Sequence, residues 1–272
     1  MNLKNIPVLF VLGATLCWSM DDNLAKGRFR FNLLFSLEEA DLYFDHAQTA
    51  VPFQLDGQPA DYTGERALLT LEYGWTSDIT LLFQTSYDAL ELNSSAGSVD
   101  SSGSPGVYMA VRQRLNSRGG FRITAESGVF VPGEADRTDP LPLGSDGIDW
   151  VLAMGYKQSF IPTKGGFELD FGYRFRNESP ADEYFVNTAL WFGLWHLGLG
   201  RIHYKTVEST REQLIEYGVL AYPNERGFQR LGFEIEGALT RTLSLKLGYG
   251  STLEGRNQFE TSGWQLGFTW VK

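Results

Sequence analysis

The sequence predicts an all-β protein, a 12-stranded antiparallel transmembrane β-barrel of the outer membrane. Three observations predict it: polar and apolar residues alternate along many segments, short and long connections alternate between these segments, and aromatic residues gather at the segment ends. Most segments are longer than the five or six residues of a strand in a soluble sheet. They match the nine to eleven residues or so with which a tilted strand crosses a bilayer.

The first 20 residues have the pattern of a signal peptide that is removed on secretion. One charge, Lys4, precedes an apolar run from Ile6 to Trp18, and two aspartates follow it almost at once. The run is shorter than the roughly 20 residues that a membrane-spanning helix needs. We therefore expect residues 21–272 to form a single β-barrel domain.

Charge and cysteine content exclude several classes of function. The formal net charge is −10, and removal of Lys4 with the leader makes it −11. Nucleic acids are bound through clustered Lys and Arg, so a nucleic-acid partner is not expected. The one cysteine, Cys17, lies in the leader, so the mature chain has no disulfide or thiolate chemistry. We expect no cofactor and no metal.

Alternation with period two is clearest in the first predicted strand. Phe29, Phe31 and Phe35 share one face, and Arg28 and Arg30 share the other. The pattern recurs in eleven more segments, whereas only residues 208–217 fit a short helix. The predicted strands are 28–35, 69–73, 79–87, 106–115, 121–131, 148–158, 166–176, 183–192, 195–205, 227–239, 243–253 and 262–271.

The connections between these strands fall into two alternating kinds. Short turns are predicted at 75–78, 116–120, 159–165, 193–194 and 240–242, and the long polar loops include 36–65, 93–105, 132–147 and 206–226. An even strand number with short turns at one end and long loops at the other is typical of outer-membrane barrels. We expect both termini on the periplasmic side. Whether the loop at 36–65 folds inward as a plug stays open.

The face opposite the lipid carries charged residues of both signs. The lumen-lining and selectivity candidates are Arg28, Arg30, Asp88, Arg112, Arg114, Arg122, Glu126, Asp149, Lys157, Glu168, Asp170, Arg174, Arg176, Arg230, Glu234, Glu236 and Lys246, with Glu72 on the same face. Arg112 and Arg114 are expected to face Arg122 and Glu126 across a hairpin. One interpretation is a charged constriction that selects solutes. The other, which the sequence supports equally, is an interior filled by ion pairs.

Two rival interpretations follow from the same residues. A large soluble β-sandwich or a lipocalin-like barrel also alternates, but it could not bury so many unpaired charges. An outer-membrane lipid hydrolase needs a histidine beside a serine or a carboxylate. The histidines are His46, His196 and His203, and only His203, with Ser209 or Glu212, could be assembled into such a site by folding. We do not expect an enzyme, and no catalytic residue is assigned.

Several stretches resemble a known family. They include GERALLTLEYGWTSDITLLFQTSY at 64–87, PLGSDGIDWVLAMGYKQSF at 142–160 and LSLKLGYGSTLEGRNQFETSGWQLGFTW at 243–270. The chain is similar to outer-membrane proteins named for the meta-cleavage pathway of phenol degradation, which are loosely grouped with long-chain fatty-acid transporters. One departure is that Val271 and Lys272 follow Trp270, where an aromatic terminus is usual.

The resemblance implies a barrel of about twelve strands that moves small hydrophobic or aromatic molecules across the outer membrane, with no catalytic residues. The expected protein is a monomer whose partners are outer-membrane lipid and a small solute. A non-conducting structural barrel is the alternative, and a lipid hydrolase is the second alternative.

Overall fold

The fold was analysed in a computed structural model. It describes residues 23–45, 47–118, 120–133, 143, 147–160, 164–177, 181–194, 198–210, 214–217, 220–223 and 227–272. The predicted signal peptide, His46 and His196 lie outside these residues, as does Glu212. No helix among the described residues is long and apolar enough to cross a membrane.

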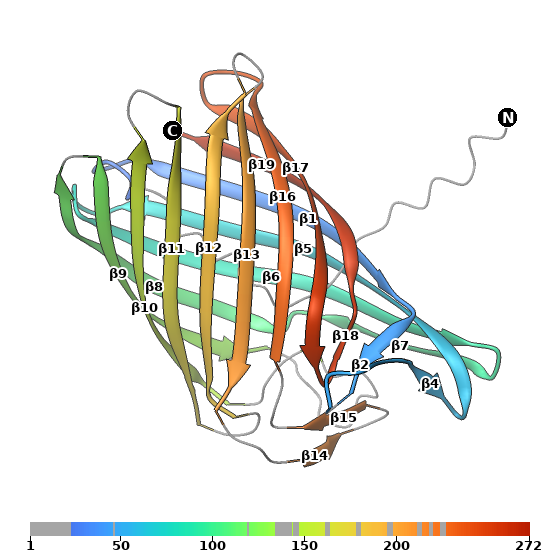
Figure 1. The fold of residues 1–272 in the computed structure, drawn as a ribbon. Helices are drawn as coiled ribbons and strands as arrows, with labels where there is room; N and C mark the ends of the chain where they lie inside the picture. The colour runs from blue at the N-terminus through green and yellow to red at the C-terminus, as the bar shows by residue number, and fades with distance from the viewer. Residues whose placement is uncertain are drawn as a thin grey trace, which may run out of the picture.

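Twelve long strands of the described chain form one closed antiparallel barrel (Figure 1). Each pairs with two neighbours, and the β5–β6 pairing closes the ring. The strands are β1 (Phe29–Ala40), β5 (Gln58–Gly74), β6 (Ile79–Ser94), β8 (Gly106–Arg118), β9 (Phe121–Pro132), β10 (Asp149–Phe160), β11 (Gly165–Arg176), β12 (Glu183–Gly193), β13 (Leu199–Ser209), β16 (Gly227–Ala238), β17 (Leu243–Arg256) and β19 (Ser262–Val271). The predicted strand number is confirmed.

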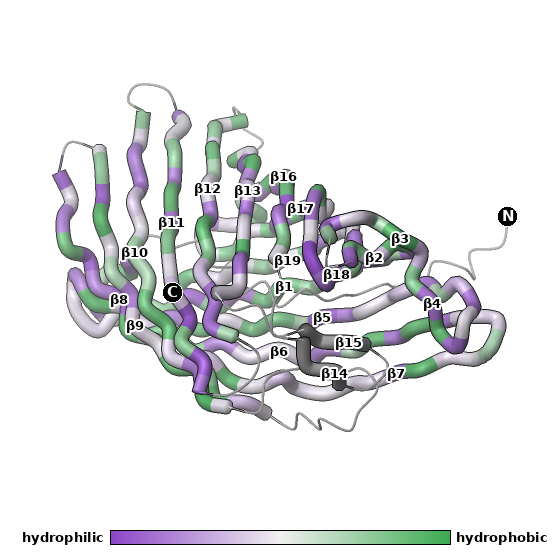
Figure 2. Tube along the Cα trace, turned by 60° about the horizontal axis from the view of Figure 1, so that its bottom comes forward, coloured by the Kyte–Doolittle hydropathy of each residue, from purple (hydrophilic) through white to green (hydrophobic). Residues whose placement is uncertain are grey.

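The outer face of this wall is apolar. In β10, Trp150, Leu152 and Met154 are exposed, while the alternating Val151 and Ala153 are buried inside the barrel. Hydrophobic and hydrophilic residues alternate along the strands in the same way elsewhere (Figure 2). A closed sheet leaves no unpaired edge, and this exterior matches the hydrocarbon of a bilayer. The protein is an outer-membrane β-barrel.

Both described ends of the barrel domain meet on the short-turn side. The Phe29 amide donates to the Lys272 carbonyl at 3.0 Å, and the Lys272 amide donates to the Phe29 carbonyl at 3.0 Å. Tight turns close the same side, for example where the Leu239 amide donates to the Leu243 carbonyl at 2.9 Å. By the rule for such barrels this is the periplasmic end.

The ninth strand lies further along the chain than predicted. The sequence suggested 195–205, whereas β13 spans Leu199–Ser209. Gly198 has a φ of 130°, and a Cβ there would clash with the Glu236 carbonyl, so the chain enters the strand only after this glycine. Within β13, Arg201, His203 and Lys205 face inward. The predicted range 195–205 added the apolar Trp195 and Leu197 to the same face, and this obscured the alternation.

Parts of the predicted long loops are strands instead. β1 continues to Ala40 and β5 begins at Gln58. Residues 93–105 contain a further strand, which pairs with the end of β6. Residues 214–217 form a strand, so the helical interpretation of 208–217 is wrong. The additional short strands are β2 (Leu42–Phe44), β3 (Ala50–Pro52), β4 (Gln54–Leu55), β7 (Gly97–Gly103), β14 (Leu214–Tyr217), β15 (Leu220–Pro223) and β18 (Gln258–Phe259).

An aromatic cluster explains why these strands extend beyond the bilayer. The Tyr62 ring of β5 stacks on the Phe259 ring with centroids 4.2 Å apart, and Tyr43 and Phe53 pack against Phe259 from the first long loop. The cluster buries the inner face of the β5–β6 extension, which includes Leu92. The described part of the first long loop therefore covers the inner wall at the long-loop end.

Candidate functional site in the barrel lumen

The barrel encloses a cavity of about 580 Å³. It lies toward the short-turn end, because Ser159, Thr240 and Thr242 line it. Leu34, Leu68 and other apolar side chains form part of its wall, and charged side chains of both signs form the rest. The cavity is large enough for a small organic molecule.

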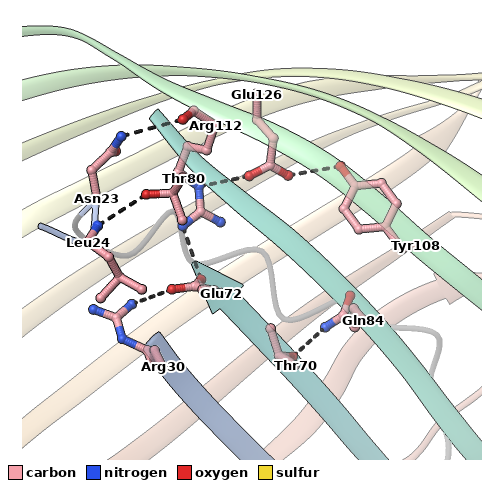
Figure 3. Close-up of polar contacts among 10 residues, drawn as sticks. All are labelled: Asn23, Leu24, Arg30, Thr70, Glu72, Thr80, Gln84, Tyr108, Arg112 and Glu126. Atoms are coloured by element: carbon pink, nitrogen blue, oxygen red, sulfur yellow. Dashed lines mark hydrogen bonds and ion pairs between the residues drawn. The ribbon is translucent and has the colours of Figure 1, made fainter. Parts of the chain in front are cut away.

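A chain of ion pairs runs along one side of the cavity (Figure 3). Arg30 Nη1 lies 2.9 Å from Glu72 Oε2, and Arg112 Nη1 lies 3.2 Å from Glu72 Oε1. Arg112 Nε lies 2.8 Å from Glu126 Oε2, and the Tyr108 hydroxyl donates to Glu126 Oε1 at 2.9 Å. We call this chain the first arc; it joins β1, β5, β8 and β9.

A second arc of ion pairs lies on the other side. Lys157 Nζ is 2.7 Å from Glu168 Oε1, and Arg201 pairs with the other oxygen of the same carboxylate. Further round the wall, Lys246 Nζ is 3.4 Å from Glu234 Oε2. All these side chains line the cavity. The charges alternate in sign from strand to strand, so each acid is neutralised locally.

The cavity wall thus has little electrostatic bias. In the first arc Glu72 lies between two arginines, and in the second Glu168 lies between Lys157 and Arg201. A lumen that gathers anions needs an excess of unneutralised cations, since their field concentrates the ions. Because the charges of the two arcs are paired, the cavity favours neither anions nor cations strongly, and uncharged side chains such as Leu68 and Thr70 form the rest of its wall.

The N-terminal residues of the described chain reach the first arc (Figure 3). The Asn23 side-chain amide donates to the Asp78 backbone carbonyl at 2.8 Å, and the Leu24 backbone amide donates to the Thr80 hydroxyl at 3.1 Å. The buried Leu24 side chain anchors this segment. Its backbone passes directly over Gly74, where a Cβ would lie only 2.2 Å from the Ala25 carbonyl oxygen.

Gly74→Val is therefore expected to displace residues 23–27 from the barrel wall while leaving the barrel folded. The added side chain would occupy the space of the Ala25 carbonyl. A backbone group cannot move aside as easily as the end of a flexible side chain can. Hydrogen exchange at the Leu24 amide should become faster. Gly57→Val, at a position with open space around it, is the comparison, although its positive φ adds local strain. Unchanged exchange at Leu24 would contradict the contact.

Other predicted residues pair nearer the long-loop end. Arg174 Nη2 is 2.6 Å from Asp149 Oδ2, and Arg176 Nη2 is 2.6 Å from Glu183 Oε2. None of these four side chains lines the cavity. In the same half of the barrel, Arg66 forms two hydrogen bonds with Asp88, and Arg230 pairs with Glu38.

Arg114 does not face the lumen pairs as predicted. The register of β6 on β8 brings Asp78 beside Arg114, whose Nε lies 2.9 Å from Asp78 Oδ1 in the short turn. The Ser77 hydroxyl and Arg114 donate to the Asp78 carboxylate and hold its pKa below its usual range. The predicted approach of Arg112 to Glu126 is present, whereas Arg122 lies opposite Ser117.

The remaining candidates lie apart from the two arcs. Arg28 is exposed, lies just before β1 begins and is not among the residues that line the cavity. Asp170 is buried on β11, opposite Asn187. Glu236 lines the cavity and accepts a hydrogen bond from the Ser244 hydroxyl at 2.5 Å.

The structure adds residues that the sequence did not single out. Arg201 and Trp191 line the cavity, and Lys157 Nζ lies 5.5 Å from the centroid of the Trp191 ring. Arg201 was missed because the alternation of its strand was obscured. Arg66 was not singled out, and Glu38 was placed in a loop. The strands that carry them extend past the bilayer, where lipid no longer requires one face to be apolar.

On the described neighbouring strands, His203 lies opposite Ala189 and Gly232 rather than a serine. It lies on the inner face of β13, opposite Gly232, where a Cβ would be 2.1 Å from His203 Nε2. Ser209 is six residues further along the same strand, a separation of about 20 Å at strand spacing. The described residues thus do not form the histidine–serine pair, and they contain no cluster of three or more potential metal ligands.

Comparison with solved structures gives an outer membrane channel from Pseudomonas putida F1, 14% identical, with a TM-score of 0.78 over 93% of this chain and 98% of that chain. The NanC porin is 8% identical, with a TM-score of 0.50 over 86% of this chain and 98% of that chain. These likenesses show the fold. No curated protein matches the sequence. The profile of one family matches residues 55–268, which is most of the chain, and the protein belongs to that family, described as "Putative MetA-pathway of phenol degradation".

Proposed function

We propose that the protein is an uptake channel for small, uncharged aromatic or hydrophobic molecules, and that it acts as a single barrel. The observation that carries this proposal is the cavity of about 580 Å³, in which the charges of the two arcs are neutralised in pairs and apolar side chains such as Leu34, Leu68 and Leu82 form part of the wall. The family name refers to phenol degradation, and the similar barrel from Pseudomonas putida is a channel. Both agree with a role in passing such solutes.

In this function the two arcs of ion pairs hold the wall open rather than capture an ion. Arg112 contacts both Glu72 and Glu126, so strands β5, β8 and β9 are tied together at the level of the cavity. A purely structural barrel would have no need for a cavity of this size, because interiors of proteins are otherwise close-packed. An enzyme would need a nucleophile and a base in contact, which His203 and Ser209 are not.

The test measures toluene influx into vesicles that carry lipopolysaccharide in the outer leaflet. The purified protein should accelerate influx of toluene, and should accelerate influx of benzoate, a charged molecule with the same ring, much less. Equal toluene influx with and without the protein would contradict the proposal.

Thr70→Trp is expected to reduce the toluene influx, because Thr70 lines the cavity and an indole would fill part of it. Leu71→Trp is the matched control, since the neighbouring Leu71 is exposed on the lipid face. Both variants should show the heat-modifiable migration of a folded barrel. If the two variants transport toluene equally well, the cavity is not the path.

A further inference from the structure

An apolar layer lies inside the barrel on the long-loop side of the cavity. It contains Leu82, Tyr108, Ala110, Phe130, Val151, Ala153, Phe185, Val207 and Phe228, which come from seven strands and are each 9% exposed or less. Phe130 lies near the end of β9, and Phe185 and Phe228 lie near the starts of β12 and β16, all at long-loop ends. Leu82 and Tyr108 also line the cavity, so the layer adjoins it.

Aromatic rings of this layer pack closely against glycines of the barrel wall. A Cβ on Gly172 would lie 2.0 Å from the Phe185 ring, and one on Gly128 would lie 2.3 Å from the Tyr108 hydroxyl oxygen. The rings of Phe185 and Tyr108 therefore occupy the space above a glycine of the neighbouring strand. Phe185, Val207 and Phe228 follow one another in register on β12, β13 and β16. The row forms a continuous apolar stretch along the inner wall.

Charged groups lie at the margins of the layer. The Arg174 guanidinium carbon is 5.0 Å from the centroid of the Phe130 ring, and Arg174 is paired with Asp149. Lys205 Nζ is 5.6 Å from the centroid of the Phe228 ring. An ion that leaves the cavity along the row of Phe185, Val207 and Phe228 would meet side chains that offer no hydrogen bond, so it would lose hydration that these side chains do not replace. Apolar constrictions exclude ions in this way by losing water.

We propose that this apolar layer is the selectivity filter of the channel: it admits uncharged apolar solutes and holds back ions and water. The inference rests on the proposed function and adds the residues that determine specificity. An apolar solute exchanges one set of apolar contacts for another as it passes Phe185 and Phe228. A hydrated ion cannot make that exchange.

The filter is tested by recording ionic current across planar bilayers. Wild-type protein should pass little current even though it passes toluene, and Phe185→Ala combined with Phe228→Ala should raise the current about tenfold, which corresponds to lowering the barrier by about 1.4 kcal/mol. The matched control is Phe171→Ala with Phe233→Ala. These phenylalanines are exposed on the lipid face of β11 and β16, so their removal should leave the current unchanged.

Val207→Thr is a second variant that nearly keeps the volume of the filter and adds a hydroxyl in the middle of the row. The added hydroxyl should raise the current. Because this substitution changes the packing less, it tests the filter even if the double alanine variant does not fold. A folded Val207→Thr protein with wild-type current, or a wild type that conducts ions as freely as the double variant, would overturn the filter. Failure of the wild type to pass toluene would instead overturn the proposed function.

Discussion

Asp88→Asn should lower the free energy of unfolding by about 3–5 kcal/mol, the usual cost of breaking a buried ion pair by removing one partner. Arg66 Nε lies 2.8 Å from Asp88 Oδ1, and Arg66 Nη2 lies 2.9 Å from Asp88 Oδ2. The Asp88 side chain is 0% exposed and that of Arg66 is 6% exposed. The neutral amide would leave the arginine charge buried without its carboxylate. Urea unfolding in lipid vesicles, followed by tryptophan fluorescence, measures the change.

Two comparisons separate this effect from a general loss of charge. Asp78→Asn also removes a carboxylate that pairs with an arginine, Arg114, but Asp78 is largely exposed, so its unfolding midpoint should stay near that of the wild type. Arg66→Met combined with Asp88→Leu removes both buried charges and should recover much of the lost stability, because the desolvation cost disappears with the pair. Equal midpoints for Asp88→Asn and Asp78→Asn would contradict the buried pair.

The number and approximate place of the strands could be predicted because lipid enforces the alternation. In β10, Trp150 to Met154 must alternate if one face is to meet hydrocarbon, and a strand of this kind shows the pattern by itself. The constraint weakens where the wall leaves the bilayer. For that reason Tyr62 was placed in the long loop at 36–65, and Leu92 was placed just before the loop at 93–105. Both lie in strands that pack against Phe259.

Partners across the lumen could not be read from one sequence. Alternation fixes which face a charge is on, but the register of neighbouring strands fixes which acid it meets. The register of β6 on β8 brings Arg114 to the Asp78 turn, while Arg112 contacts Glu126 across the β8–β9 hairpin. The apolar layer was also hidden, because both faces of the predicted strand 183–192 mix polar and apolar residues, so the sequence does not show that Phe185 faces inward.

The orientation of the wall in the membrane can be tested at the middle of β10. Met154 is 54% exposed and points away from the lumen. Met154→Arg should cost about 2–4 kcal/mol of folding free energy, because a guanidinium at the bilayer midplane loses its hydration. Phe160→Arg is the matched control at the end of the same strand, where the cost should be about 0–1 kcal/mol because the charge reaches the interface. Both are measured by the same vesicle unfolding assay.

The contrast between these two arginines follows from the position of the bilayer alone. On the surface of a water-soluble barrel, Met154 and Phe160 would both face solvent, and an arginine would be tolerated equally at either position. Equal unfolding free energies for Met154→Arg and Phe160→Arg would therefore contradict the membrane-spanning arrangement. A depth-dependent cost would show that the exposed apolar band of β10 faces hydrocarbon, which in turn makes the enclosed cavity the water-accessible side of the wall.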